Sequence, residues 1–215
     1  MPDVLIANLP YLLRGASTTL VLSIVVVGLG SLLGTALGIA VSMGGRLLRA
    51  LITSYIFTLR GIPVLVVMLL GYYLVPALGA TPNAYVAVAA AQIAYVAAFA
   101  AEIIRGAIAS VPAGQVAAAR SLGMRRLRML RAVILPQATR IAIPPLLNNA
   151  LTAVKQTSYV SVVGVWELSY AAREVVERTL ASFQIFLGVM AMYFLICYPL
   201  SLLARWSEQR SRMAH

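Results

Sequence analysis

The chain has 215 residues, of which 61% are apolar and only 11% are charged, whereas soluble globular domains carry roughly 25% charged residues. That composition excludes an ordinary soluble domain. The formal net charge is +11, but the basic residues cluster between apolar blocks, so we expect them to set the topology of a membrane protein and expect no nucleic-acid partner.

The apolar blocks predict an all-α polytopic membrane protein with five transmembrane helices in a single domain, residues 1–215. Each block approaches or exceeds the roughly 20 residues that a helix needs to cross the hydrocarbon layer of a membrane. The predicted spans are approximately residues 18–43, 53–76, 84–104, 138–162 and 183–204.

The distribution of basic residues predicts how these spans are oriented. Eleven of the seventeen basic residues follow the first, third and fifth spans, and basic residues concentrate in cytoplasmic segments. We therefore expect the first and third connections and the C-terminus in the cytoplasm, and the N-terminus outside. Residues 1–17 have no basic region before a short apolar core, unlike a signal peptide, and we expect them to remain and to lie along the outer membrane surface.

The first span carries three glycines at intervals of four, Gly30, Gly34 and Gly38. This spacing puts them on one helix face, where small residues let another backbone approach closely. The face is either a packing surface, within this protein or against a partner, or a general feature of a glycine-rich membrane helix.

The second span is interrupted by Arg60-Gly61-Ile62-Pro63. Proline removes a backbone donor and glycine loosens the helix, so we predict a kink or a break there. Arg60 either faces a water-filled cavity or a partner, or extends to the cytoplasmic interface.

The third span contains a polar pair and a charged pair. Gln92 and Tyr95 share a helix face, and Glu102 is three residues from Arg105. At that spacing an ion pair can form, and we expect it to be structural.

The connection from residue 106 to 136 is the most informative segment. Pro112 and Gly114 predict a turn, and a helix is expected from Gln115 to Gly123. The following basic run places Leu127, Leu130 and Val133/Ile134 on an apolar face. By composition alone this run is an amphipathic anchor for anionic lipid at the membrane surface.

The fourth span is the most polar one. Asn148, Thr152 and Lys155 recur at helical spacing, and Thr157 and Ser158 follow. Polar groups at membrane depth need partners or water, so these side chains are the candidate solute site. The outer loop that follows, with Trp166, predicts a short amphipathic helix, and the fifth span has few distinctive features.

No catalytic or metal site is expected. The chain has one cysteine, Cys197, and one histidine, His215, too few for a metal cluster. It also lacks the glycine-rich G-x-x-x-x-G-K-[ST] sequence of ATP-hydrolysing proteins. We therefore expect no cofactor and no enzymatic activity, and any ATP hydrolysis belongs to another polypeptide.

The connection closely resembles the EAA loop of ABC-importer permeases, whose pattern is E-A-A-x3-G-x9-I-x-L-P. Here Ala118, Ala119 and Gly123 match, and the segment ends in Leu135-Pro136, whereas Ala117 stands in place of the glutamate and Val133 in place of the isoleucine. Further segments resemble the polar-amino-acid branch of that family, among them RGIPVLVVMLLGYY, ILPQATRIAIPPLLNN and KQTSYVSVVGVWEL.

This resemblance implies a permease subunit in a bacterial inner membrane. The family works as a dimer, identical or mixed, with two ATP-binding subunits and an extracytoplasmic solute-binding protein. Residues 114–123 would be the coupling helix that contacts the ATPase, through Gly114, Ala117, Ala118, Ala119 and Gly123. Small polar solutes would be bound by Arg60, Asn148, Lys155, Thr157 and Ser158, although Gln156 replaces an aspartate of the family motif.

Two other classes of function compete with a permease of an ABC importer. An ATP-independent channel or secondary carrier would use the polar fourth span, but secondary carriers often have more spans and internal repeats. A membrane-embedded enzyme lacks any catalytic constellation. Dependence on ATP hydrolysis and on a binding protein distinguishes the importer from the carrier.

Overall fold

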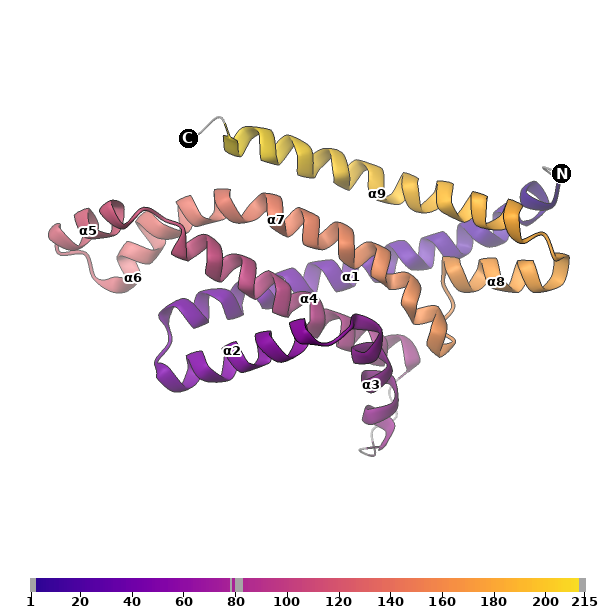
Figure 1. Ribbon diagram of the computed structural model, residues 1–215, viewed down its shortest axis with the longest axis horizontal. Coiled ribbons are helices and arrows are strands. Elements are labelled where there is room, and N and C mark those ends of the chain that lie inside the picture. Colours follow the sequence, from indigo (N-terminus) through magenta and orange to yellow (C-terminus); the bar gives the residue numbers. More distant parts are fainter. Residues whose placement is uncertain (1–2, 78, 80–82, 213–215) are drawn as a thin grey trace.

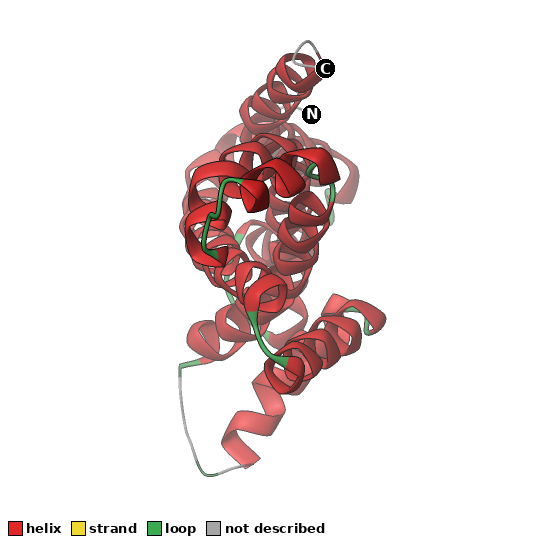
Figure 2. Cartoon of the chain, turned by 90° about the vertical axis from the view of Figure 1, so that its left-hand side faces the viewer, coloured by secondary structure: helices red, strands yellow, loops and turns green. Residues whose placement is uncertain are grey.

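The computed structural model describes residues 3–77, 79 and 83–212, and this part of the chain contains helices and short loops but no strands (Figure 2). The prediction of an all-helical protein is confirmed. In Figure 1 the long helices run along one axis, with the N-terminus and α8 at one end and the α5–α6 segment and the C-terminus at the other.

The first helix, α1, is continuous from Asp3 to Met43 and passes through Pro10. Residues 3–17 therefore continue into the first predicted span as one helix. Leu12 and Ala16 are buried against α8 and α9 in a cluster with Leu168 and Val175. This packing holds the first turns in line with the rest of the helix, despite the backbone hydrogen bond that Pro10 removes.

The second predicted span is broken as expected. Helix α2 (Arg46–Gly61) and helix α3 (Val64–Ala77) meet at Ile62-Pro63 and are bent by 109° relative to each other. Ile62 has an extended backbone with φ −110° and ψ 137°, the conformation that a following proline favours.

Helix α4 (Ala84–Ala109) lies against the glycine face of α1. A Cβ atom added to Gly34 would be 2.5 Å from the Cβ of Ala100, and one added to Gly38 would be 2.7 Å from the carbonyl oxygen of Ala101. The glycines therefore form a packing surface within the chain, where they allow α1 and α4 to approach closely.

The segment after α4 contains α5 (Ala113–Ser121), α6 (Arg126–Met129), a π-helical turn η1 (Leu130–Ile134), α7 (Leu135–Gln156) and a 3₁₀ helix η2 (Thr157–Val163). The chain continues through α8 (Leu168–Thr179) to α9 (Ser182–Arg212). Helix α8 is the predicted amphipathic helix of the outer loop, and its buried face consists of Leu168, Ala171, Ala172 and Val175.

Three of the described helices are long and apolar enough to cross a membrane, namely α1, α4 and α9. The bent pair of α2 and α3 brings the number to four if it forms one span. Helix α7 carries the polar run of the fourth predicted span and is not among these apolar helices.

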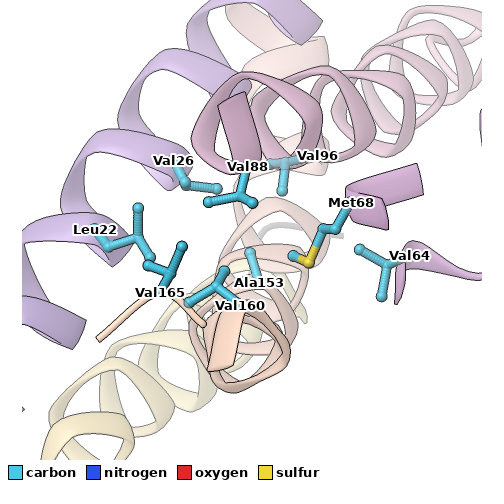
Figure 3. Packing of buried hydrophobic residues seen from close by; sticks show 9 residues of the cluster. All are labelled: Leu22, Val26, Val64, Met68, Val88, Val96, Ala153, Val160 and Val165. Atoms are coloured by element: carbon cyan, nitrogen blue, oxygen red, sulfur yellow. The ribbon is translucent and has the colours of Figure 1, made fainter. Parts of the chain in front are cut away.

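The central core joins α1, α3, α4 and the segment from α7 to Val165. Figure 3 shows the side chains of this cluster directed toward one another between the helices. Met68, Val88 and Val160 are completely or almost completely buried. The core thus fixes α7 and η2 against α1, α3 and α4. This packing positions the polar residues of α7 and η2.

Candidate functional site

Helix α5 lies at one end of the molecule and ends in a glycine turn (Figure 1). The expected helix over 115–123 is shifted, because Ser121 is its last residue and Gly123 has a left-handed backbone with φ +70°. Residues with side chains rarely adopt that conformation. The Gly123 N–H donates to the Arg120 carbonyl at 2.9 Å and the Met124 N–H to the Ala119 carbonyl at 3.2 Å, so the turn satisfies the helix end.

The predicted coupling residues lie on two sides of α5. Ala119 is 3% exposed and packs into a cluster with Met129 and Leu130. Gly114, Ala117 and Ala118 are exposed. One alanine thus anchors the helix, and the other residues form an outward surface with small side chains.

The predicted apolar face of the basic run after Gly123 is buried only in part. Met129, Leu130 and Ile134 are buried, whereas Leu127 is 47% exposed. A π-helical turn follows over Leu130–Ile134, where it changes the angle between successive side chains. Arg126 connects this segment to α1 through a 3.1 Å hydrogen bond from its Nη2 to the Ser42 carbonyl.

The outer side of the α5–α6 segment is basic and hollowed. A depression of about 750 Å³ is lined by Leu122, Gly123, Met124, Arg125, Leu127, Arg128, Arg131 and Ala132. The sequence has no acidic residue between Glu102 and Glu167. The residues that line the depression are therefore arginines, apolar side chains and a glycine, with no carboxylate among them.

Arg60 lies at the end of α2 beside α4. Its Nη1 is 3.5 Å from Oε1 of Glu102, and its guanidinium carbon lies 5.4 Å from the centre of the Phe99 ring. Glu102 also accepts two hydrogen bonds from Arg105, at 2.8 and 2.7 Å. The predicted Glu102–Arg105 ion pair is thus confirmed, and the structure adds Arg60 to it.

The other predicted solute-binding residues lie on α7 and η2, and none of them lines the pocket that contains Arg60. Asn148 and Lys155 are exposed, and Asn148 donates to Glu208 of α9 at 3.1 Å. The Thr157 side chain is buried and donates to the Val154 carbonyl at 2.7 Å, while Ser158 donates to the Lys155 carbonyl at 2.8 Å. In this conformation both hydroxyl groups are used to close the turn between α7 and η2.

Gln92 ties α4 to α7 beneath this polar stripe. Its amide nitrogen donates to the Ala153 carbonyl at 3.0 Å, whereas its buried Oε1 atom has no hydrogen-bond partner among the described residues. The sequence marked Gln92 as a polar residue within a span but gave no indication of its partner, which lies 61 positions away.

Glu167 connects several helices through buried hydrogen bonds, a role that was not predicted from the sequence. Its carboxylate is completely buried and accepts hydrogen bonds from the Thr19 hydroxyl at 3.2 Å, the Tyr193 hydroxyl at 3.0 Å and the Tyr170 N–H at 3.0 Å. It joins α1, α8 and α9. Its position directly before the amphipathic helix was the available signal, because acidic side chains stabilise helix N-termini.

Among the described residues, no group of three His, Cys, Asp or Glu side chains is arranged to hold a metal ion. The arrangement instead offers two kinds of surface. One is the small-residue and arginine surface of α5 and α6, suited to binding another protein. The other kind consists of polar and cationic side chains in two separate places, Arg60 on α2 and the residues of α7 and η2, each suited to a polar or anionic solute.

Residues 30–213 match the family described as the binding-protein-dependent transport system inner membrane component. The L-cystine transport system permease protein TcyB of Bacillus subtilis (strain 168) is 36% identical over 202 residues, covering 94% of this chain and 86% of that protein. The probable glutamine ABC transporter permease protein GlnM of the same organism is 34% identical over 208 residues, covering 97% and 96%.

A solved structure is similar over almost the whole fold. A chain of an amino acid ABC transporter crystallised with histidines superposes with a TM-score of 0.88 at 32% identity, covering 95% of this chain and 96% of that one. Sequence and architecture therefore point to the same class of protein.

Proposed function

The chain belongs to the family of binding-protein-dependent transport system inner membrane components, and from that membership we propose that it forms the translocation path of an importer for polar amino acids. It is a permease subunit of an ABC importer and not a catalytic enzyme. The solute class rests on relatives whose names specify cystine and glutamine transport.

The proposed topology has five spans. The bent pair α2–α3 forms the second span and α7 with η2 the fourth, in addition to α1, α4 and α9. The proposal is supported by the position of the arginine-rich connections, because the α1–α2 connection, the α5–α6 segment and the C-terminus share one end of the molecule (Figure 1). We therefore propose that this end lies in the cytoplasm and that the N-terminus lies outside.

The coupling proposal is carried by one observation: the EAA-like pattern falls on an exposed helix, α5, that ends in a glycine turn at that same end. A separate ATP-binding subunit would contact Gly114, Ala117 and Ala118 on its exposed face. Movement of α5 would pass through Ala119 and the buried Leu130 to α7. A rigid-body switch of this kind needs no chemistry from the permease.

The matched substitutions Gly123→Ala and Gly114→Ala test this coupling. Added Cβ atoms meet no atom within 4 Å at either site, but only Gly123 has a left-handed φ. Alanine in that conformation costs about 1–3 kcal/mol of local strain. We expect Gly123→Ala to lower solute-stimulated ATP hydrolysis roughly fivefold or more, measured in lipid nanodiscs with the ATPase and binding-protein partners.

Gly114→Ala controls for the added methyl group and leaves the fold of this chain unchanged. Normal coupling in Gly123→Ala would contradict a role for the α5 turn. Solute uptake into proteoliposomes without ATP would contradict the importer itself and favour a secondary carrier.

For the solute we propose that Lys155 and Asn148 on α7, with Arg60 on α2, contact it during the transport cycle. A cation near the path suits the α-carboxylate of an amino acid. Thr157 and Ser158 would join them only after their hydroxyl groups release the backbone carbonyls that now accept from them.

Lys155→Gln tests this proposal, with Lys155→Arg as the charge-preserving control. A hydrogen bond to a charged group contributes about 1.5–3 kcal/mol, so the solute concentration for half-maximal stimulation of ATP hydrolysis should rise at least about tenfold in Lys155→Gln. The arginine variant should stay much closer to the unmodified protein. An unchanged solute response in Lys155→Gln would show that Lys155 does not contact the solute.

The remaining partners follow from family membership. We propose a dimer with an identical or related permease subunit, two ATP-binding subunits and an extracytoplasmic solute-binding protein. Because Ala117 replaces the glutamate of the EAA pattern, a mixed dimer in which the other subunit keeps that glutamate is the preferred arrangement. Ala117→Glu should then strengthen coupling in complexes that contain only this permease.

A further inference from the structure

A pocket of about 480 Å³ lies where the C-terminal end of α1 meets α2 and α4. Three arginines line it, Arg49 and Arg60 from α2 and Arg105 from α4, together with a single acidic residue, Glu102. On α2 the two arginines share a helix face with Thr53 and Ile56, which also line the pocket. The remaining walls are largely apolar.

The pocket carries more positive charge than its own carboxylate can balance. Glu102 is already bonded to Arg105 at 2.7 Å and lies 3.5 Å from Arg60. The Nε of Arg49 donates to the Val41 carbonyl at 3.3 Å, and none of the ion pairs found among the described residues includes Arg49. Since Arg60 is assigned to the solute, Arg49 is the positive charge of this pocket that remains for an external anion.

The surroundings favour an anion that carries an apolar part. Phe57 lines the pocket and is 81% exposed, and Leu47 and Leu51 on the same helix are 75% and 61% exposed. In the proposed topology this end of α2 lies at the cytoplasmic face of the membrane, where anionic headgroups of the inner leaflet accumulate and basic pockets between helices bind them.

We propose that this pocket binds the phosphate headgroup of an anionic phospholipid, with the acyl chains against the exposed apolar residues of α2. The proposal rests on the proposed topology of the permease. Free inorganic phosphate shares the anionic chemistry but cannot use the apolar surface, so the two sources are separable by experiment.

The test compares Arg49→Gln with Arg46→Gln. Both arginines are exposed residues of α2, but Arg46 does not line the pocket. The purified chain would be reconstituted in phosphatidylcholine with a minor fraction of phosphatidylglycerol, and retained phosphatidylglycerol would be measured by native mass spectrometry. Because a basic residue near the membrane surface contributes about 1 kcal/mol to anionic-lipid binding, retention should fall about fivefold in Arg49→Gln and stay unchanged in Arg46→Gln.

Arg49→Lys keeps the charge and should retain most of the lipid, and thermal melting of each variant checks that the fold is intact. Equal retention in Arg49→Gln and the unmodified chain would overturn the proposal. So would displacement of the lipid by millimolar inorganic phosphate, which would make the pocket a site for the free ion.

The lipid-binding experiment can fail or succeed independently of the experiments that test the proposed function. Lipid retention is measured on the permease alone, whereas importer activity requires the ATPase and the binding protein. Labelling of a cysteine placed at Gly45 from one side of the membrane tests the orientation. If that cysteine reacts only from outside while retention still depends on Arg49, the topology fails and the lipid site remains, in the opposite leaflet.

Discussion

Replacing Gly34 by alanine is expected to destabilise the folded chain by about 3 kcal/mol, the upper range for overpacking a well-packed interface. The new Cβ atom would lie 2.5 Å from the Cβ of Ala100 and 2.6 Å from the Ala97 carbonyl oxygen. A backbone carbonyl in a helix cannot move aside without shifting α4 as a whole. The effect is measured by heating the protein in detergent and then quantifying, by gel filtration, the fraction that remains folded.

Gly28→Ala is the matched control on the same helix, since a Cβ atom there meets nothing within 4 Å. That variant should be neutral or more stable by up to about 1 kcal/mol, because alanine favours the helix over glycine. Equal melting of the two variants would show that α1 and α4 are not in close contact.

Replacing Glu167 by alanine is expected to cost about 3 kcal/mol or more. The substitution removes the acceptor that the Thr19 and Tyr193 hydroxyl groups share with the Tyr170 N–H. The hydroxyl groups keep the Gly15 carbonyl and Ser169 as partners, but the Tyr170 N–H loses its side-chain acceptor, which costs about 1–3 kcal/mol, and the loss of a completely buried side chain leaves a cavity. The helices α1, α8 and α9 would lose their shared contact. Glu177→Ala, at an exposed site with a 4.0 Å ion pair to Arg173, should change stability by less than about 1 kcal/mol.

Glu167, which lies outside the predicted spans, also makes stability depend on pH. Burial raises the pKa of its carboxyl group above the usual value, and hydrogen bonds from the Ser169 and Tyr170 backbone, Tyr193 and Thr19 oppose this only partly. The folded state therefore keeps a proton that the unfolded chain has lost. Stability should fall as the pH rises from the ordinary carboxyl pKa through the raised one.

Glu167→Gln cannot titrate and should remove that part of the pH dependence. The contribution of Glu167 is measured by comparing the melting temperatures of the Glu167→Gln variant and the unmodified chain at pH values between the ordinary and the raised carboxyl pKa. A Glu167→Gln variant with the same pH slope as the unmodified chain would assign the dependence to another group.

Features fixed by local chemistry could be predicted from the sequence. The break between α2 and α3 follows from Gly61 and Pro63, whatever else is nearby. The amphipathic helix α8 and the Glu102–Arg105 pair likewise depend on spacing within one helix. The functional class was recognisable because the spacing from Ala118 to Pro136 matches a pattern of the family to which the chain belongs.

Features that depend on distant contacts could not be predicted. Helix α1 stays continuous through Pro10 because Leu12 packs against residues more than 150 positions away, and the sequence around Pro10 does not indicate that contact. The π-helical turn over Leu130–Ile134 could not be predicted because it has no clear sequence signature. In the candidate site, the proximity of Arg60 to Glu102 depends on how α2 lies against α4, which no local pattern specifies.

The absence of acidic residues around the arginines of α5 and α6 has an energetic consequence for membrane insertion. The five arginines between α4 and α7 have no neighbouring carboxylate in sequence to cancel their charge. Moving one elementary charge against the membrane potential costs about 2.3 kcal/mol per 100 mV, so translocating this connection to the positive side would cost roughly 11 kcal/mol at that potential. In the proposed topology, an energised membrane would therefore favour the connection on its negative side, and the potential itself would help to maintain the orientation of the two helices that flank it.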